Sequence, residues 1–255
     1  MKVVILAGGL GTRISEESHL KPKPMVEIGE RPVLWHIMKC YSKFGFYDFV
    51  ICCGYKSYVI KEYFYNYHLH TSDITFNFAD ENHMEIHKSK TEPWKVTLVD
   101  TGRNTETAGR IGRVREYIKD QTFMLTYGDG LSDIDIPALV KHHKASGKKA
   151  TLTAILPEGR FGALEISQEG LVNRFVEKPP GDNAWINGGF MVMEPEVLKM
   201  IKGDKTDLQG EVLPALAAEG ELTAYYHHGF WHAMDTIRDK EKLEALWDSG
   251  NAPWM

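Results

Sequence analysis

The sequence is poor in cysteine, has no long apolar run and carries no excess of basic charge. Its three cysteines, Cys40, Cys52 and Cys53, are too few for a disulfide framework, and they predict reduced thiols in a cytoplasmic protein. No window approaches about 18 apolar residues, and the apolar run at residues 3–7 is too short for a signal peptide, so we expect no membrane partner and no export. The 35 acidic residues outnumber the 30 basic ones, which disfavours a nucleic-acid partner.

The composition and the pattern of apolar residues predict an α/β fold. Of the 255 residues, 43% are hydrophobic and 25% are charged, which suits a protein with a sizeable core. Short apolar runs at residues 3–7, 49–53 and 123–127 each stop at a glycine and read as buried strands. Apolar residues at helical spacing separate them, so we expect a mixed, mostly parallel Rossmann-like sheet flanked by helices.

The rest of the chain is less regular. Further strands are expected at residues 151–156, 163–167, 171–177, 187–193 and 225–234, and helices at 195–202 and 207–218. Residues 80–94 are polar without a clear period and predict an exposed excursion or an arm used in assembly. No linker rich in proline, glycine or serine divides the chain, so we expect one domain over residues 1–255, with halves at about 1–150 and 151–255.

A glycine-rich loop gives the strongest local signal. Residues 6–13 read LAGGLGTR, directly after the first predicted strand. Glycines let backbone N–H groups approach an anion, and the guanidinium of Arg13 adds a permanent positive charge with paired N–H donors. A nucleotide phosphate requires both. The loop is not a Walker motif, and Ile14 stands where a dinucleotide fingerprint has its third glycine. A plain glycine turn at the end of a strand is the alternative interpretation.

Charged residues follow this loop and a later strand. Lys21 and Lys23 lie in the stiff segment KPKPM, which favours either a phosphate contact or a solvated basic turn. Asp129, between two glycines at the carboxyl end of the strand at 123–127, suits a Mg²⁺ ligand or an Asx turn. Asp235 in WHAMD is a second isolated carboxylate. The segments EKP at residues 177–179 and NGG at 187–189 also have turn, cap or surface explanations.

Together these segments resemble the sugar-1-phosphate nucleotidylyltransferase family. The motifs LAGGLGTR, KPKPM, YGDGLSD and WHAMD occur in the family's order, and the resemblance runs from Val3 to about Leu246. It implies a fold of the nucleotide-diphospho-sugar transferase type, with a nucleotide-binding first half and a sugar-binding second half. The chain is most similar to the cytidylyl-transferring members, which implies CTP and α-D-glucose 1-phosphate as substrates and Mg²⁺ as cofactor.

The resemblance also implies a role for individual residues. It implies catalytic roles for Lys23, Arg13 and Asp129, and metal binding by Asp129 and Asp235. It implies a nucleotide site made by Leu6, Ala7, Gly8, Gly9, Gly11, Thr12, Arg13, Asn104, Arg110 and Gly128. It implies a sugar-phosphate site made by Gly162, Glu177, Lys178, Asn187 and Gly188. One departure lies at Ala108, where family members often have a second glycine.

Several alternatives stay open at this point. The same fold can use UTP, dTTP or another phosphorylated acceptor, or serve as a non-catalytic regulatory subunit. A nicotinamide oxidoreductase would need a glycine near position 14 and an acidic residue about 20 positions later, which Glu30 and Asp48 fit poorly. The resemblance also implies a homo-oligomer, with a hexamer as one option, and residues 80–94 are the candidate contact segment.

Overall fold

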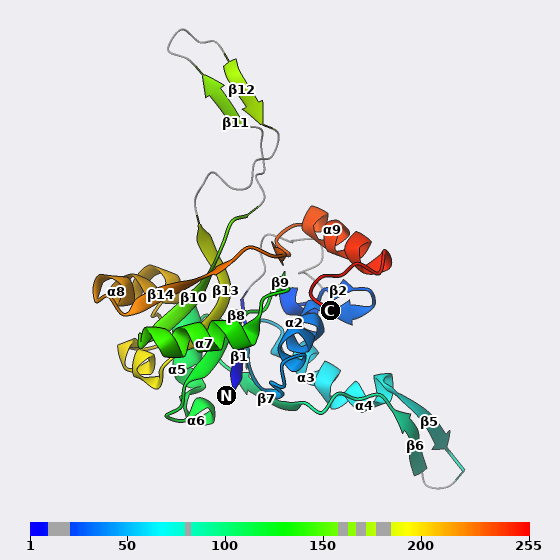
Figure 1. Cartoon of the computed structure of the whole chain (residues 1–255). Coiled ribbons are helices and arrows are strands. Elements are labelled where there is room, and N and C mark those ends of the chain that lie inside the picture. Colours follow the sequence, from blue (N-terminus) through cyan, green and yellow to red (C-terminus); the bar gives the residue numbers. More distant parts are fainter. Residues whose placement is uncertain (10–20, 80–82, 158–162, 167–171, 177–184) are drawn as a thin grey trace.

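A central seven-stranded sheet organises the chain in the computed structural model, which describes residues 1–9, 21–79, 83–157, 163–166, 172–176 and 185–255 (Figure 1). Only β13 runs against both of its neighbours, and the other pairings are parallel. This confirms the mixed, mostly parallel sheet. The strand order is β14 (Leu222–His227), β10 (Ala150–Ile155), β13 (Ile186–Met193), β8 (Phe123–Tyr127), β1 (Val3–Leu6), β4 (Asp48–Cys53) and β7 (Lys95–Asp100).

Strand β1 shows why the sheet is buried on both faces. Val3 and Ile5 pack into one hydrophobic cluster and Val4 and Leu6 into the other, because successive side chains of a strand point to opposite faces. The first cluster is covered by α2 (Val33–Ser42), α7 (Ile136–Ser146) and α9 (Ile237–Asp248), and the second by α5 (Thr107–Arg113), α6 (Arg115–Ile118) and α8 (Leu213–Ala218). Three layers result, with β1 at their centre.

The order of the strands positions a site. From β1 the chain passes outward to β4 and β7, and it then returns to add β8 on the other side of β1. The connections that follow the parallel strands β1 and β8 therefore leave their shared carboxyl edge toward opposite sides of the sheet. In open α/β sheets ligands bind at such a switch point.

Short elements connect the sheet to its surroundings. They are the 3₁₀ turns η1 (Lys23–Met25) and η2 (Pro195–Met200), the π-helical turn η3 (Leu208–Val212), the strand pairs β2 (Glu27–Ile28) with β3 (Arg31–Pro32) and β9 (Gly130–Ser132) with β15 (Trp231–Ala233), and the helices α3 (Ser57–Tyr65) and α4 (Tyr67–His70). Two hairpins lie outside the layers, β5 (Ser72–Asn77) with β6 (His83–Ser89) and β11 (Ala163–Ile166) with β12 (Val172–Val176) (Figure 1).

One prediction of local structure was wrong and another was incomplete. The stretch at residues 80–94 contains the exposed strand β6, which agrees with an exposed excursion, but the pairing of β6 with β5 was not predicted. The single strand expected at 225–234 is two strands. The first, β14, pairs with β10 in the central sheet, and the second, β15, pairs with β9 outside it. In the described part of the chain no helix is long and apolar enough to cross a bilayer. The three cysteines are free and buried, as expected.

Candidate active site

A cavity of about 240 Å³ lies at the carboxyl ends of β1 and β8, where the strand order predicts a site. We refer to it as the first cavity. Its lining residues come from both strand ends, from η1 and from the start of α5, and are Leu6, Ala7, Gly8, Gly9, Lys23, Pro24, Thr105, Glu106, Thr107, Arg110, Tyr127, Gly128 and Asp129. The first cavity is therefore lined by residues that are far apart in the sequence.

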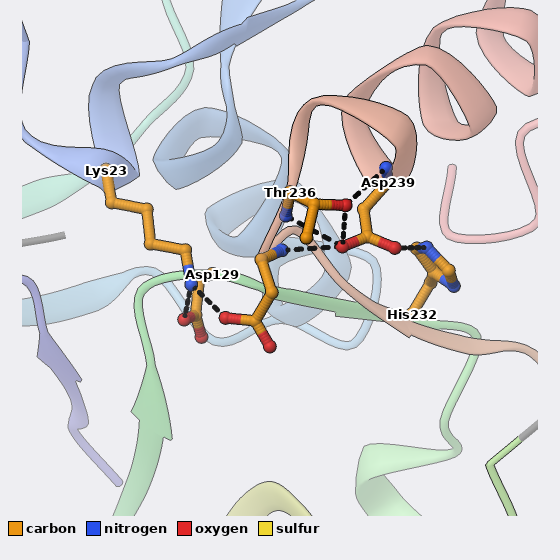
Figure 2. A network of polar contacts seen from close by, with 6 residues as sticks. Lys23, Asp129, His232, Thr236 and Asp239 are labelled. Atoms are coloured by element: carbon orange, nitrogen blue, oxygen red, sulfur yellow. Dashed lines mark hydrogen bonds and ion pairs between the residues drawn. The ribbon is translucent and has the colours of Figure 1, made fainter. Parts of the chain in front are cut away.

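Lys23 joins two carboxylates at one end of this cavity. Its Nζ lies 2.5 Å from Oδ2 of Asp129 and 2.7 Å from Oδ1 of Asp235, and its side chain is 12% exposed (Figure 2). Burial opposes the charge of this ammonium. The Coulombic attraction of Asp129 and hydrogen bonds to both carboxylates outweigh that penalty, and the pKa of Lys23 lies above its usual value. The ammonium is therefore a fixed positive charge.

Local structure places these three groups. Prolines on both sides of Lys23 hold η1, and the backbone N–H of Met234 donates to the carbonyl of Asp129 at 2.9 Å, which brings the two aspartate segments together. The N–H of Asp235 donates to Oδ2 of Asp239 at 3.1 Å. Asp239 forms a capping box with Thr236 at the start of α9 and contacts His232 at 3.1 Å (Figure 2).

Arg110 also lines the cavity and is 4% exposed. Its guanidinium donates to Oγ1 of Thr101 at 2.8 Å and to the carbonyl of Gly102 at 2.7 Å. Burial lowers the pKa of Arg110, but a guanidinium stays charged at neutral pH. Gly8 makes this position possible, because a Cβ there would lie 2.2 Å from Nη1 of Arg110.

The loop before α5 is held by a distant segment. The N–H of Glu106 donates to the carbonyl of Asp204 at 2.8 Å, and the N–H of Gly109 donates to the carbonyl of Thr206 at 3.1 Å. The hydroxyl of Thr107 donates to Oδ2 of Asp207 at 3.1 Å. Residues 204–207 thus position one wall of the first cavity without lining it.

Tyr127 connects the cavity to β13. Its hydroxyl accepts a hydrogen bond from Gln209 at 3.0 Å and one from the side-chain amide of Asn187 at 3.5 Å. Burial raises the pKa of Tyr127 to about 12, so the phenol is neutral near pH 7. Gly188, next to Asn187, accepts a hydrogen bond from the indole of Trp231 at 2.7 Å.

The predicted site residues divide into three groups. The first cavity brings together Leu6, Ala7, Gly8, Gly9, Lys23, Arg110, Gly128 and Asp129, with Asp235 bound to Lys23 beside it. Asn187 and Gly188 lie behind Tyr127, and Asn104 is exposed, with its carbonyl accepting a hydrogen bond from Lys205. The residues outside the described ranges are Gly11, Thr12, Arg13, Gly162, Glu177 and Lys178.

Five lining residues were missed: Pro24, Thr105, Glu106, Thr107 and Tyr127. Tyr127 could have been found, since it precedes Gly128 and Asp129 at the end of a predicted strand. Thr105, Glu106 and Thr107 lie between the predicted residues Asn104 and Arg110, but they form no recognisable motif of their own.

The carboxylates at the first cavity suit a hard cation. Asp129 and Asp235 converge on the same ammonium, so a positive ion that replaced this ammonium could reach both. Mg²⁺ takes oxygen ligands and is usually held by one or two carboxylates together with phosphates and water. Within the described ranges no group of three or more His, Cys, Asp or Glu side chains forms a metal cage. The donor set therefore fits a cation that is shared with a phosphorylated ligand.

Comparisons with known proteins agree with this geometry. The family profile described as nucleotidyl transferase matches residues 2–248. The chain is 62% identical over 255 residues to a glucose-1-phosphate cytidylyltransferase of Salmonella typhi, covering 100% of this chain and 98% of that protein. It is 42% identical over 255 residues to a probable glucose-1-phosphate cytidylyltransferase of Bacillus subtilis, covering 100% and 99%. The crystal structure of HddC from Yersinia pseudotuberculosis has the same fold, with a TM-score of 0.69 at 24% identity over 96% of this chain and 99% of that chain.

Proposed function

The chain belongs to the nucleotidyl transferase family, and from this premise we propose that it transfers the cytidylyl group of CTP to α-D-glucose 1-phosphate, giving CDP-glucose and pyrophosphate. The observation that carries the proposal is the 62% identity to the Salmonella typhi glucose-1-phosphate cytidylyltransferase over the whole chain. The two cationic side chains that line the first cavity, Lys23 and Arg110, support it, because both substrates are polyanions.

The reaction needs charge compensation more than proton transfer. An oxygen of glucose 1-phosphate attacks the α-phosphorus of CTP, a new P–O bond forms, and the bond to the β-phosphate breaks, so pyrophosphate leaves. A phosphomonoester has a second pKa of about 6, and the nucleophile is therefore already ionised at neutral pH. The site has to bring two anions into line and stabilise the charge of the transition state.

We then assign a role to each group of residues that lines the first cavity. We assign Lys23 to the phosphates of both substrates, which it reaches by leaving its carboxylate partners. We assign Arg110 and the loop before α5 to the base, and Leu6, Ala7, Gly8, Gly9 and Gly128 to the nucleotide backbone. The predicted roles of Asn104, Asn187 and Gly188 stay proposals, as do those of Gly11, Thr12, Arg13, Gly162, Glu177 and Lys178.

We propose that Asp129 and Asp235 hold the Mg²⁺ ion implied by the family. The support is that both carboxylates face one positive charge and that the donors are all oxygen. When bound, the ion supplies positive charge to the phosphate oxygens. Lys23 has two acceptors in this structure, and it would donate to phosphate oxygens once the carboxylates have another cation.

The experiment that tests the function is pyrophosphate release from CTP, UTP, dTTP and GTP, each with glucose 1-phosphate and a small panel of other phosphorylated acceptors. We expect strong release with CTP and glucose 1-phosphate together. Cytosine carries an amino donor where uracil carries a carbonyl, so a buried acceptor for that donor discriminates strongly. Release with a different pair would refute the specificity, and no release with any pair would refute the activity.

We also propose that the chain forms a homo-oligomer through its β5–β6 hairpin, which we call the arm. Ile74 pairs with Ile86 and Phe76 with Met84 on one face of the arm, and Phe76 is 51% exposed. A two-stranded hairpin with an exposed apolar face is marginally stable alone, and a symmetric interface would cover two such faces at once.

Light scattering after size exclusion tests the assembly. We expect a mass that is a multiple of 29.0 kDa for the unmodified chain and a shift toward the monomer for Phe76→Glu. Thr75→Glu, on the other face of the arm, is the matched control and should not change the mass. A monomeric unmodified chain would refute the proposal. The buried free thiols support the further proposal of a reducing, cytoplasmic location.

A further inference from the structure

A second cavity is lined by residues of α2, of α4 and of both strands at the base of the arm, the hairpin that Figure 1 shows outside the layers. Its volume is about 460 Å³, within the range of small-molecule sites. It is lined by Arg31, Trp35, Tyr67, His70, Thr71, Ser72, Asp73, Lys88, Lys90 and Glu92, none of which lines the first cavity. The roles assigned so far therefore leave it without a function.

The aromatic wall of this cavity is rigid. The indole of Trp35 donates to the hydroxyl of Tyr67 at 2.8 Å, and that hydroxyl donates to Oε2 of Glu92 at 2.5 Å. Trp94 stacks against Tyr67 from behind, with ring centroids 5.7 Å apart. The wall is thus organised before any ligand arrives, which lowers the entropic cost of binding.

The charges of the cavity favour an anion. Glu92 is already engaged, since its other oxygen lies 3.3 Å from Nζ of Lys39. Across the described part of the chain, no hydrogen bond or ion pair occupies the ammonium groups of Lys88 and Lys90. The two lysines are two residues apart in extended chain, so they lie on the same side of it. Arg31 adds a third cation, with its guanidinium carbon 5.7 Å from the centroid of Trp35.

Ser72 adds a donor that lacks an acceptor. Its hydroxyl oxygen is buried and has no hydrogen-bond partner among the described residues, although the side chain belongs to the lining of the second cavity. A buried polar group without a partner is costly and rare in folded proteins. Rotation of the Ser72 side chain toward the cavity would let this hydroxyl donate to a ligand oxygen.

We propose that the second cavity binds a small phosphorylated molecule. Its phosphate lies against Lys88, Lys90 and Arg31, where the hydroxyl of Ser72 can donate to it. Its organic part lies against the edges of Trp35 and Tyr67. The proposal does not rest on the proposed function, because it concerns different residues and is measured by binding.

The site is linked to the catalytic lysine by a short segment. Arg31 in β3 pairs with Ile28 in β2, which follows the η1 turn that carries Lys23. The N–H of Val33 donates to the carbonyl of Val26 at 2.9 Å and ties the start of α2 to the same turn. Arg31 is therefore connected, through β2 and the Val33–Val26 hydrogen bond, to the turn that positions Lys23.

Calorimetric titration of the full-length Lys23→Ala protein tests the proposal, since we expect its turnover to be strongly reduced. The probes are cytidine 5′-diphosphate, glucose 6-phosphate and inorganic phosphate, which separate nucleotide, sugar phosphate and bare anion. We expect at least one organic phosphate to bind more tightly than inorganic phosphate. Adding Lys88→Gln and Lys90→Gln should weaken that binding at least tenfold.

The matched control is Lys141→Gln with Lys144→Gln, which removes the same charge from exposed positions on α7. It should leave the affinity within twofold. Equal weakening by both pairs would show only a general charge effect and overturn the proposal, as would the absence of any binding. Ser72→Ala should weaken binding severalfold without lowering the Tm, because the hydroxyl has no partner to lose; a lower Tm with unchanged affinity would assign it a structural role instead.

Discussion

The two cavities are built in opposite ways. In the first, every named cation already has partners: Lys23 lies between two carboxylates, and Arg110 donates to Thr101 and Gly102. In the second, Lys88 and Lys90 have none within the described residues. The first lies at the ends of buried parallel strands, and the second lies between helices and an exposed hairpin.

This difference separates a site that reacts from one that only binds. Charges held by partners stay ordered beside the cavity when no ligand is present, so little side-chain order is lost when they turn to the phosphates. Charges without protein partners break no protein contact on binding, but they lose hydration and their side chains must be ordered by the ligand. Substitutions of the charged residues of the first cavity should therefore affect kcat or the Mg²⁺ requirement, and substitutions of the charged residues of the second should affect affinity.

The largest effect is expected from Lys23→Ala. Removing the ammonium takes away a positive charge that faces the reacting phosphates, and losses of about 10²–10³ in kcat are typical for one such donor. Pyrophosphate release measures it, with circular dichroism to confirm the fold. Lys88→Ala should leave kcat within twofold at saturating substrates. Near-normal turnover of Lys23→Ala, or an equal loss in Lys88→Ala, would break the contrast between the cavities.

The next effect concerns the carboxylates. Asp129→Asn and Asp235→Asn should each raise the Mg²⁺ concentration for half-maximal activity, by about tenfold or more, because each loses a charged oxygen ligand. Activity measured against Mg²⁺ gives both values. Asp73→Asn at the second cavity is the control and should leave the Mg²⁺ curve unchanged. Shifts in opposite directions would mean that the two aspartates do not share an ion.

The sheet and the lysine end of the first cavity could be predicted because their signals are local. Apolar runs that stop at glycine gave β1, β4 and β8 within a residue, and Asp129 follows one of them. A carboxylate at the carboxyl end of a parallel strand needs no tertiary information to be suspected.

The remainder depends on contacts between distant segments. Strand β6 exists through its pairing with β5, and its exposed residues gave no buried pattern. Thr105, Glu106 and Thr107 line the first cavity because residues 204–207 hold their loop. The second cavity unites residues from five elements, so no motif marks it. Such features depend on tertiary contacts and cannot be recognised from local patterns in the sequence.

A smaller effect is expected at the wall of the first cavity. In Gly109→Ala a Cβ would lie 2.5 Å from the carbonyl oxygen of Asp204, and backbone at that distance has to shift. Overpacking of this kind costs about 1–3 kcal/mol. We expect a higher KM for CTP with little change in kcat, together with a lower urea midpoint.

Gly112→Ala in the same helix is the control for Gly109→Ala. Its Cβ would lie 3.0 Å from the side chain of Ile201, which can move, and the helix gains propensity. We expect its KM for CTP and its urea midpoint to stay near those of the unmodified chain. If the two variants had the same KM, the segment at residues 204–207 would not position the cavity wall.

The smallest effect on turnover is expected from His36, a buried residue of α2 that lines neither cavity. Its Nδ1 accepts from the indole of Trp254 at 3.1 Å, so the proton resides on Nε2, which donates to the carbonyl of Ile28 at 2.8 Å. Burial lowers the pKa of His36 to about 4. In the unfolded chain a histidine has a pKa of about 6.5, so it takes up a second ring proton at a higher pH than His36 does in the folded chain. The contribution of His36 to the free energy of unfolding is therefore complete above pH 6.5, and about 3 kcal/mol of it is lost as the pH falls toward 4. Urea unfolding of the unmodified chain and of His36→Gln, at pH 7.5 and pH 4.5, measures this. We expect the unmodified chain to be the more stable one by an amount that is smaller at pH 4.5, and we expect kcat at neutral pH to be unchanged. A stability difference independent of pH would mean that His36 is not held neutral by the fold.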